Sequence, residues 1–226
     1  MKHLIVTRCD NSQSEMARIS HPLIKEYARK CNADFGILDK GDDVGVSTHY
    51  RILKFYDLFE KYDRILSVDT DVIIRKDTPN IFDIVPPNMV GTIYEDKGSR
   101  EQERLRRIKQ VQTQFGDVGW KHGYINTGFA LFSREHRIIF EPSDVLYDGY
   151  GYDDVWLGYK IVKYKKQVFE LDPRLNFMSM FTEPWCGMRK SDAFVLHYAG
   201  KGFIPYLDRV EQMKRDLYIL RRYGIV

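Results

Sequence analysis

The first third of the chain alternates short apolar runs with amphipathic segments. Short apolar runs bounded by polar residues predict strands at 4–6, 34–39 and 62–68. Apolar residues that recur every three or four positions predict helices at 22–31 and 47–61. The order of strand, helix, strand, helix and strand is typical of a parallel sheet with helices on its faces.

The rest of the chain mixes the two patterns and shows no repeat or linker. We expect the helix at 22–31 to begin at Pro22, because proline suits the first turn of a helix. The length of 226 residues suits an α/β fold in one domain, 1–226, with a mixed, mainly parallel sheet. Further strands are predicted at 89–94, 124–132, 167–171 and 193–197, and helices at 100–114, 151–164 and 207–223.

Polar residues follow the first three predicted strands at the same end. Thr7 and Arg8 follow the first strand, Asp39 the second, and Asp69 and Asp71 the third. Ligands bind beyond the carboxyl ends of the strands in such sheets. Acids inside an apolar run are costly to bury unless they are paired or bound to metal, and Mg²⁺ and Mn²⁺ prefer oxygen ligands. The acid pair therefore predicts a metal site, with two solvated acids as the alternative.

Composition narrows the possible classes of function. A net charge of +3 does not suggest a nucleic-acid-binding protein, which usually carries a concentrated basic face. No apolar run reaches the length of about 18 residues that a membrane span needs. The three cysteines form no metal motif and no disulfide framework, which favours a reducing compartment. We therefore expect the protein to be located in the cytoplasm, or in the host cytoplasm if the protein is viral.

Four segments in order resemble GT-A-fold glycosyltransferases. They are most similar to the glycogenin and lipopolysaccharide galactosyltransferase group, with its relatives in phages and large DNA viruses. The resemblance extends from Leu4 to about Lys201. It implies metal-dependent transfer of a sugar from a nucleoside diphosphate, with UDP expected, to a glycan hydroxyl with retention. The segments are the Asp-Thr-Asp region 62–82, Asn-Thr-Gly at 126–128, Tyr-Asp-Asp at 152–154, and His-Tyr-Ala-Gly-Lys at 197–201.

The resemblance also implies a role for individual residues. Residues 1–95 would bind the nucleotide and 96–226 the acceptor. Three residues would hold Mn²⁺ or Mg²⁺: Asp69, Asp71 and His197. Seven would contact the donor: Thr7 and Arg8 at the base and ribose, Arg51, Lys54 and Thr70 beside them, and Gly200 and Lys201 near the diphosphate. Three would act on the sugar or acceptor: Asn126, Asp153 and Asp154.

The chain departs from the pattern of that group at two places. The group usually has Asp-Gln where Asp153-Asp154 stands, and a tryptophan expected after the Gly-x-Lys segment is replaced by residues 203–206. These departures concern the acceptor site and the stereochemistry, and an inverting enzyme would use Asp153 or Asp154 as its base.

Structural alternatives stand beside each role. Asp153 or Asp154 would then cap a helix, Asn126 would lie in a bulge, and His197 would be a structural histidine. Arg51 and Lys54 would then lie on a solvated helix face. The charged run 97–109 is usually a solvated helix, and its functional interpretation is a lid or a surface for an anionic acceptor. Two other functions are alternatives to sugar transfer, a sugar-nucleotide pyrophosphorylase and a non-catalytic binding module. A pyrophosphorylase normally has a glycine-rich loop after its first strand, and residues 7–12 contain no glycine.

Overall fold

The computed structural model describes all 226 residues and contains two sheets. The larger has six strands in the order β2-β1-β3-β6-β5-β7, and the smaller pairs β4 with β8. Only β6 runs against the other strands of the larger sheet, so the predicted mixed, mainly parallel sheet is confirmed. The strands are β1 His3–Arg8, β2 Asp34–Leu38, β3 Arg64–Asp69, β4 Val72–Ile74, β5 Met89–Thr92, β6 Phe129–Ser133, β7 Gln167–Glu170 and β8 Val195–His197.

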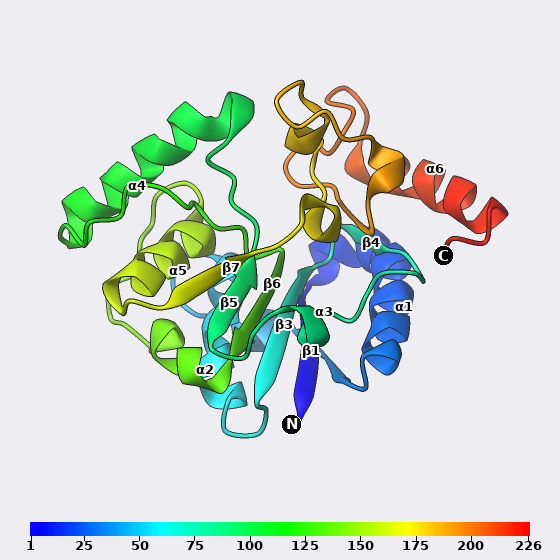
Figure 1. The fold of residues 1–226 in the computed structure, drawn as a ribbon. Helices are drawn as coiled ribbons and strands as arrows, with labels where there is room; N and C mark the ends of the chain where they lie inside the picture. The colour runs from blue at the N-terminus through cyan, green and yellow to red at the C-terminus, as the bar shows by residue number, and fades with distance from the viewer.

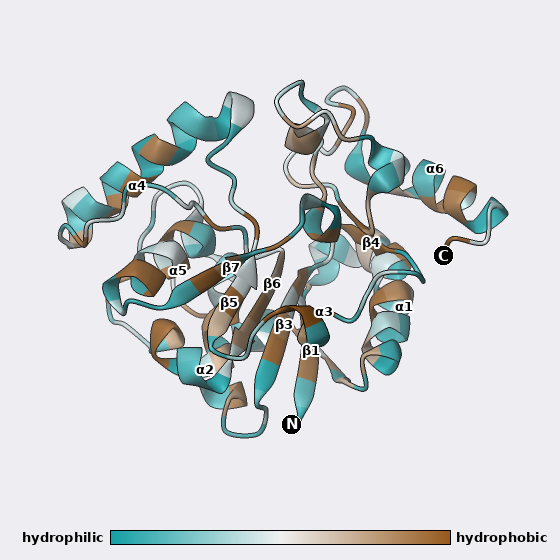
Figure 2. Cartoon of the chain, in the orientation of Figure 1, coloured by the Kyte–Doolittle hydropathy of each residue, from teal (hydrophilic) through white to brown (hydrophobic).

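Helices cover both faces of the larger sheet. Helices α1 and α6 lie on one side, and α2, α4 and α5 lie on the other (Figure 1). The strands of the larger sheet are apolar over most of their length, whereas the outer helix α4 is largely hydrophilic (Figure 2). The helices are α1 Ser14–Lys30, α2 Phe55–Leu58, α3 Ile81–Ile84, α4 Glu101–Phe115, α5 Tyr152–Lys163 and α6 Arg209–Arg222.

The sheet register brings the first polar residues of the site together. Strands β1 and β3 are parallel and almost wholly buried, and Arg8 pairs in register with Asp69 at their carboxyl ends. Strand β6 runs antiparallel to β3, and the backbone N–H of Asp69 donates to the carbonyl of Gly128 at 2.8 Å. The segment before β6 therefore lies beside the end of β3.

Three predicted elements differ from the structure. Helix α1 begins at Ser14, and Pro22 lies inside it, because Met16 and Ile19 extend its buried face toward the N-terminus. That burial outweighs the one backbone hydrogen bond that proline cannot donate. The segment 47–61 is mainly a 3-10 helix, Thr48–Lys54, followed by the short α2. In the segment 124–132, regular pairing starts only at Phe129.

Strand β4 was not predicted, and it explains how a distant histidine reaches the acid pair. Val72 of β4 pairs with His197 of β8 in an antiparallel register. The backbone N–H of Tyr198 donates to the carbonyl of Asp71 at 2.9 Å. The chain near residue 197 is thus held directly against the turn that carries Asp69 and Asp71. None of the helices is both long and apolar enough to cross a membrane.

Candidate metal and donor site

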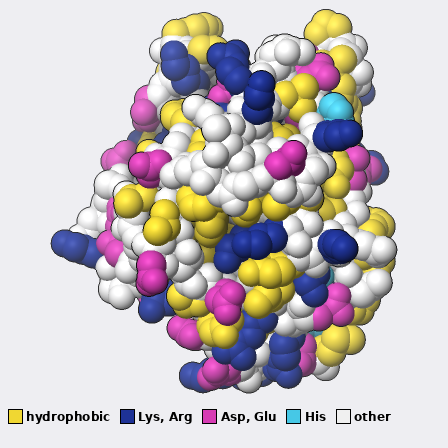
Figure 3. Space-filling view, turned by 90° about the vertical axis from the view of Figure 1, so that its left-hand side faces the viewer, with side chains coloured by type: hydrophobic (Ala, Val, Ile, Leu, Met, Phe, Trp, Pro, Cys, Tyr) yellow, Lys and Arg dark blue, Asp and Glu magenta, His cyan; other side chains and the backbone are white.

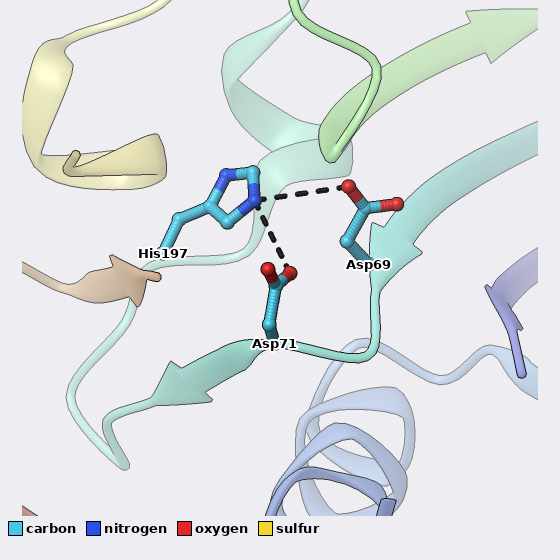
Figure 4. Close-up of side chains that lie close together, drawn as sticks. All are labelled: Asp69, Asp71 and His197. Carbon is cyan, nitrogen blue, oxygen red and sulfur yellow. Dashed lines mark ion pairs between the residues drawn. The ribbon is translucent and has the colours of Figure 1, made fainter. Parts of the chain in front are cut away.

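Asp69, Asp71 and His197 converge on one point (Figure 4). One ligand atom from each residue lies within 4.8 Å of the other two. Nε2 of His197 is 3.3 Å from Oδ1 of Asp71 and 3.7 Å from Oδ2 of Asp69. Two carboxylates and an imidazole form a donor set that suits Mn²⁺ or Mg²⁺ completed by phosphate and water. The structure therefore brings the three predicted ligands together.

Electrostatics in this cluster favour charged groups despite burial. Burial works against ionisation of Asp71, but His197 and Arg209 outweigh it and hold the pKa of Asp71 at about 2. Burial likewise opposes a charge on His197, but Asp71 and Asp69 raise the pKa of His197 above its ordinary value. Because a metal ligand must be a neutral imidazole, metal binding would displace a proton here.

A cation from the last helix shares one of the acids. Nη1 of Arg209, the first residue of α6, donates to Oδ2 of Asp71 at 2.6 Å. The start of α6 is fixed by Asp208, whose carboxylate accepts from the backbone N–H of Val210 at 2.8 Å. A guanidinium held in this way beside a metal site is placed to meet phosphate oxygens.

Arg8 links the acid pair to the start of α5. Its guanidinium donates to Asp69 at 2.6 Å, to Asp153 through a short ion pair, and to the hydroxyl of Thr127 at 3.2 Å. Burial opposes its charge, but Asp153 and Asp69 raise the pKa of Arg8 above its usual value. Arg8 is thus a buried bridge between two groups of acids, although it also lines the cavity described below.

Asp153 and Asp154 lie in the first turn of α5, and neither carboxylate caps that helix. Oδ1 of Asp154 accepts from the backbone N–H of Thr127 at 2.8 Å. Burial and the neighbouring Asp153 raise the pKa of Asp154 well above its ordinary value. The two adjacent carboxyls therefore differ, since a charge on Asp153 is paired with Arg8 whereas a charge on Asp154 is opposed by burial and by Asp153.

The residue between the acids and the histidine has no room for a side chain. A Cβ at Gly128 would lie 2.7 Å from Oδ2 of Asp69 and even closer to the ring of His197. It would also crowd Oδ1 of Asn126 at 3.1 Å. Glycine is therefore required here by the close approach of the site to the backbone.

These residues line one cavity of about 520 Å³ at the carboxyl ends of β1 and β3. Of the predicted donor residues, Arg8, Arg51, Thr70 and Gly200 line it, as do the predicted ligands and Asn126, Asp153 and Asp154. Thr7, Lys54 and Lys201 are not among the lining residues. Thr7 is buried and contacts Thr70 at 3.3 Å, whereas Lys201 is exposed. Arg51 pairs with Asp43 and Asp10, so it is not a solvated side chain.

Comparison with known proteins decides the family. Residues 4–136 match the model of glycosyl transferase family 8. The chain belongs to glycosyl transferase family 8. The family 8 chain is therefore a glycosyltransferase, and the predicted resemblance is confirmed. No curated protein sequence matches it.

Solved structures agree with this fold. A glycosyltransferase involved in glycosylation of the major capsid of PBCV-1 is similar with a TM-score of 0.61 and 16% identity, over 97% of this chain and 100% of that one. The galactosyltransferase LgtC, solved with donor and acceptor sugar analogs, is similar with a TM-score of 0.59 and 17% identity, over 96% and 95% of the two chains. The bifunctional glycosyltransferase WbbM is similar with a TM-score of 0.62 and 14% identity, over 99% of this chain and 51% of that one.

The sequence interpretation missed several residues of this family 8 site. Glu95 is buried and accepts from Arg100 at 3.0 Å and from Arg104 at 2.8 Å, which brings helix α4 to the cavity. Asn176 contacts His197 at 2.8 Å. The predicted charged run 97–109 is thus partly turned inward. On the outer face nearest α4, basic, acidic and apolar side chains are interspersed rather than gathered by type (Figure 3).

Proposed function

We propose that this glycosyltransferase uses Mn²⁺ or Mg²⁺ to transfer a sugar from a UDP-sugar to a glycan hydroxyl. The observation that carries the proposal is the convergence of Asp69, Asp71 and His197 at the wall of a polar cavity. A bound metal would act as a Lewis acid that neutralises charge on the departing diphosphate. Asp69, Asp71 and His197 would hold it, and Arg209 would meet the same phosphates as a fixed cation.

The nucleotide would extend from the phosphates toward the carboxyl end of β1. Thr48, His49 and Arg51 line that part of the cavity together with Thr70. Arg51 is fixed by ion pairs to Asp10 and Asp43, so its guanidinium offers a preset contact for ribose or phosphate oxygens. The predicted contacts of Lys54 and Lys201 with the donor remain part of this proposal as contacts from outside the cavity wall.

The transferred sugar would lie against Asn126, Asp153 and Asp154. Retention at the anomeric carbon is supported by the contacts of the two acids. Asp153 is held by Arg8 and by the hydroxyl of Thr127 at 2.7 Å, and Asp154 accepts from the backbone N–H of Thr127 at 2.8 Å. Neither is a free carboxylate ready to remove a proton from an acceptor hydroxyl, as an inverting mechanism requires.

The acceptor would enter from the side of α4, within the predicted acceptor half 96–226. Arg100, Arg104, Arg107 and Tyr150 line that end of the cavity. Tyr150 is 75% exposed, and the guanidinium of Arg107 lies 4.2 Å from the centre of its ring. An exposed aromatic face held by a guanidinium suits stacking against a sugar ring.

The free cysteines support the predicted cytoplasmic location.

Thermal unfolding with nucleotides tests the proposal. UDP and a panel of UDP-sugars should raise the melting temperature in Mn²⁺ and much less in EDTA, while GDP should have a smaller effect. Asp71→Asn should abolish the metal-dependent rise in melting temperature. Asp144→Asn, at an exposed acid outside the cavity, should leave that rise unchanged. A failure of every nucleotide to stabilise the protein in Mn²⁺ would exclude the proposed donor class.

A further inference from the structure

A line of buried hydrogen bonds runs from His197 away from the acids. Nδ1 of His197 lies 2.8 Å from Oδ1 of Asn176, and Nδ2 of Asn176 donates to Oδ1 of Asn126 at 2.8 Å. Nδ2 of Asn126 donates to Oε1 of Glu95 at 2.7 Å. All four side chains are at most 5% exposed, so water offers few alternative partners. In such a chain all the hydrogen bonds donate in the same direction, and the donor or acceptor character of the group at each end determines that direction.

The Glu95 end of the chain fixes that direction. A carboxylate only accepts hydrogen bonds, and Glu95 is kept as a carboxylate by two arginines, Arg100 and Arg104. Asn126 must therefore turn its NH₂ group toward Glu95. The backbone N–H of Gly128 donates to Oδ1 of Asn126 at 3.0 Å, and this second contact requires the same orientation. Two independent groups thus leave Oδ1 of Asn126 as an acceptor.

The direction is passed to the histidine by Asn176. Its NH₂ group must face Asn126, so its carbonyl oxygen must face His197, and Nδ1 of His197 must carry a proton. We propose that Asn176 is a positioning residue that keeps the proton on Nδ1 of His197 and leaves Nε2 as the atom that faces Asp69 and Asp71. The consequence for metal binding rests on the proposed function, whereas the tautomer itself does not.

The backbone also holds Asn176 in place for this task. Asn176 ends a short 3-10 helix, Pro173–Asn176, and the next residue, Phe177, bonds to β8. The N–H of Phe177 donates to Val195 at 2.8 Å, and its carbonyl accepts from the N–H of His197 at 2.9 Å. The amide and the imidazole are therefore carried by two segments that are bonded to each other. A partner of this kind, which fixes the free nitrogen of a ligand histidine, typically changes metal affinity 10- to 100-fold.

The tautomer is measured directly by ¹⁵N NMR of the imidazole at pH 9, with His197 assigned by comparison with His197→Gln. The wild-type protein should show the Nδ1–H form. Asn176→Leu removes the acceptor and should shift His197 toward the Nε2–H form, and Asn176→Asp keeps an acceptor and should retain Nδ1–H. The matched control is Asn80→Leu, which removes the cap of α3 and should leave His197 unchanged. If Asn176→Leu does not fold, Asn176→Ala removes the acceptor with a smaller side chain.

Calorimetric titration with Mn²⁺ alone adds a second readout. Asn176→Leu should bind Mn²⁺ at least about tenfold more weakly than wild type, and Asn176→Asp should restore the affinity. An Nε2–H form in the wild type, or an unchanged Nδ1–H form in both Asn176→Leu and Asn176→Ala, would overturn the positioning role. If the tautomers behave as expected but the wild type binds no Mn²⁺, the proposed metal-dependent function fails and the role of Asn176 stands.

Discussion

The guanidinium of Arg209 lies 2.6 Å from Oδ2 of Asp71, so the start of α6 touches a proposed metal ligand. Arg209→Ala removes a positive charge beside the metal and a donor for phosphate. We expect Mn²⁺ alone to bind as tightly or more tightly, because a repulsive charge is gone. UDP in Mn²⁺ should bind about tenfold or more weakly, as expected for the loss of a charge-assisted hydrogen bond.

Arg215→Ala is the matched control for that experiment, because Arg215 lies on the same helix, is exposed and does not line the cavity. Its UDP affinity should change by less than about threefold, in line with the small effect of exposed charges. Calorimetry with UMP and UDP checks whether Arg209 contacts the phosphates, because the loss of affinity in Arg209→Ala should be larger for UDP than for UMP. A loss in Arg215→Ala as large as that in Arg209→Ala would contradict the assignment of the phosphate contact to Arg209.

The two adjacent acids of α5 should respond differently to neutralisation. Burial and Asp153 oppose a charge on Asp154 and raise its pKa, so Asp154→Asn, which puts an uncharged amide of the same shape there, should change stability little. Asp153→Asn removes a charge that faces buried Arg8 and should cost about 3 kcal/mol of unfolding free energy. Urea unfolding at neutral pH measures both. Equal losses would contradict the assignment, and loss of sugar transfer in stable Asp154→Asn would support a catalytic role for Asp154.

Gly128→Ala should disrupt the metal site more than the fold. Its methyl group would press on Asp69 and on the ring of His197, and crowding of this kind costs roughly 1–3 kcal/mol. Mn²⁺ affinity, measured by titration, should fall about tenfold or more, because both ligands must move. Gly36→Ala in β2, whose methyl would lie 3.0 Å from Val6, should lose stability without losing Mn²⁺ affinity. Normal Mn²⁺ binding by Gly128→Ala would place the metal elsewhere.

Glu95 should make stability depend on acidic pH. Burial opposes its charge, but Arg104 and Arg100 outweigh it and lower the pKa of Glu95 below its ordinary 4.5. A lowered folded-state pKa gives stability that is fully present above pH 4.5 and is lost as pH falls through the folded-state value. The free energy of unfolding, measured with urea, should be larger for wild type than for Glu95→Gln at neutral pH. This difference between the two proteins should become smaller below pH 4.5. A gap that widens on acidification would contradict this pairing.

The sequence predicted the parts of the site that repeat a local pattern. Asp69 and Asp71 stood out because acids interrupt an apolar run, whereas the ligand role of His197 came from the resemblance of its segment to the family. The parallel order of β1, β2 and β3 followed from apolar spacing alone. The pairing of β4 with β8 did not, because three-residue strands carry too little pattern to reveal a partner far along the chain.

The missed residues share a different property. Glu95, Asn176 and Arg209 each contact a site residue that is distant in the sequence, and nothing in their neighbouring sequence marks them as inward-facing. Arg8 was expected beside the nucleotide base, whereas it bridges Asp69 and Asp153. Such contacts depend on how distant segments meet in space, which no local periodicity describes.

The short sheet of β4 and β8 also bears on how the protein comes to be active during synthesis. The ribosome makes Asp69 and Asp71 long before His197, and a domain generally folds as a unit. The family 8 match ends at residue 136, before Asn176, His197 and Arg209. A nascent chain of that length would carry two of the three ligand residues and neither of the two supporting side chains. Metal capture is therefore expected late, when the last strand docks, so that an incomplete chain is not a working enzyme.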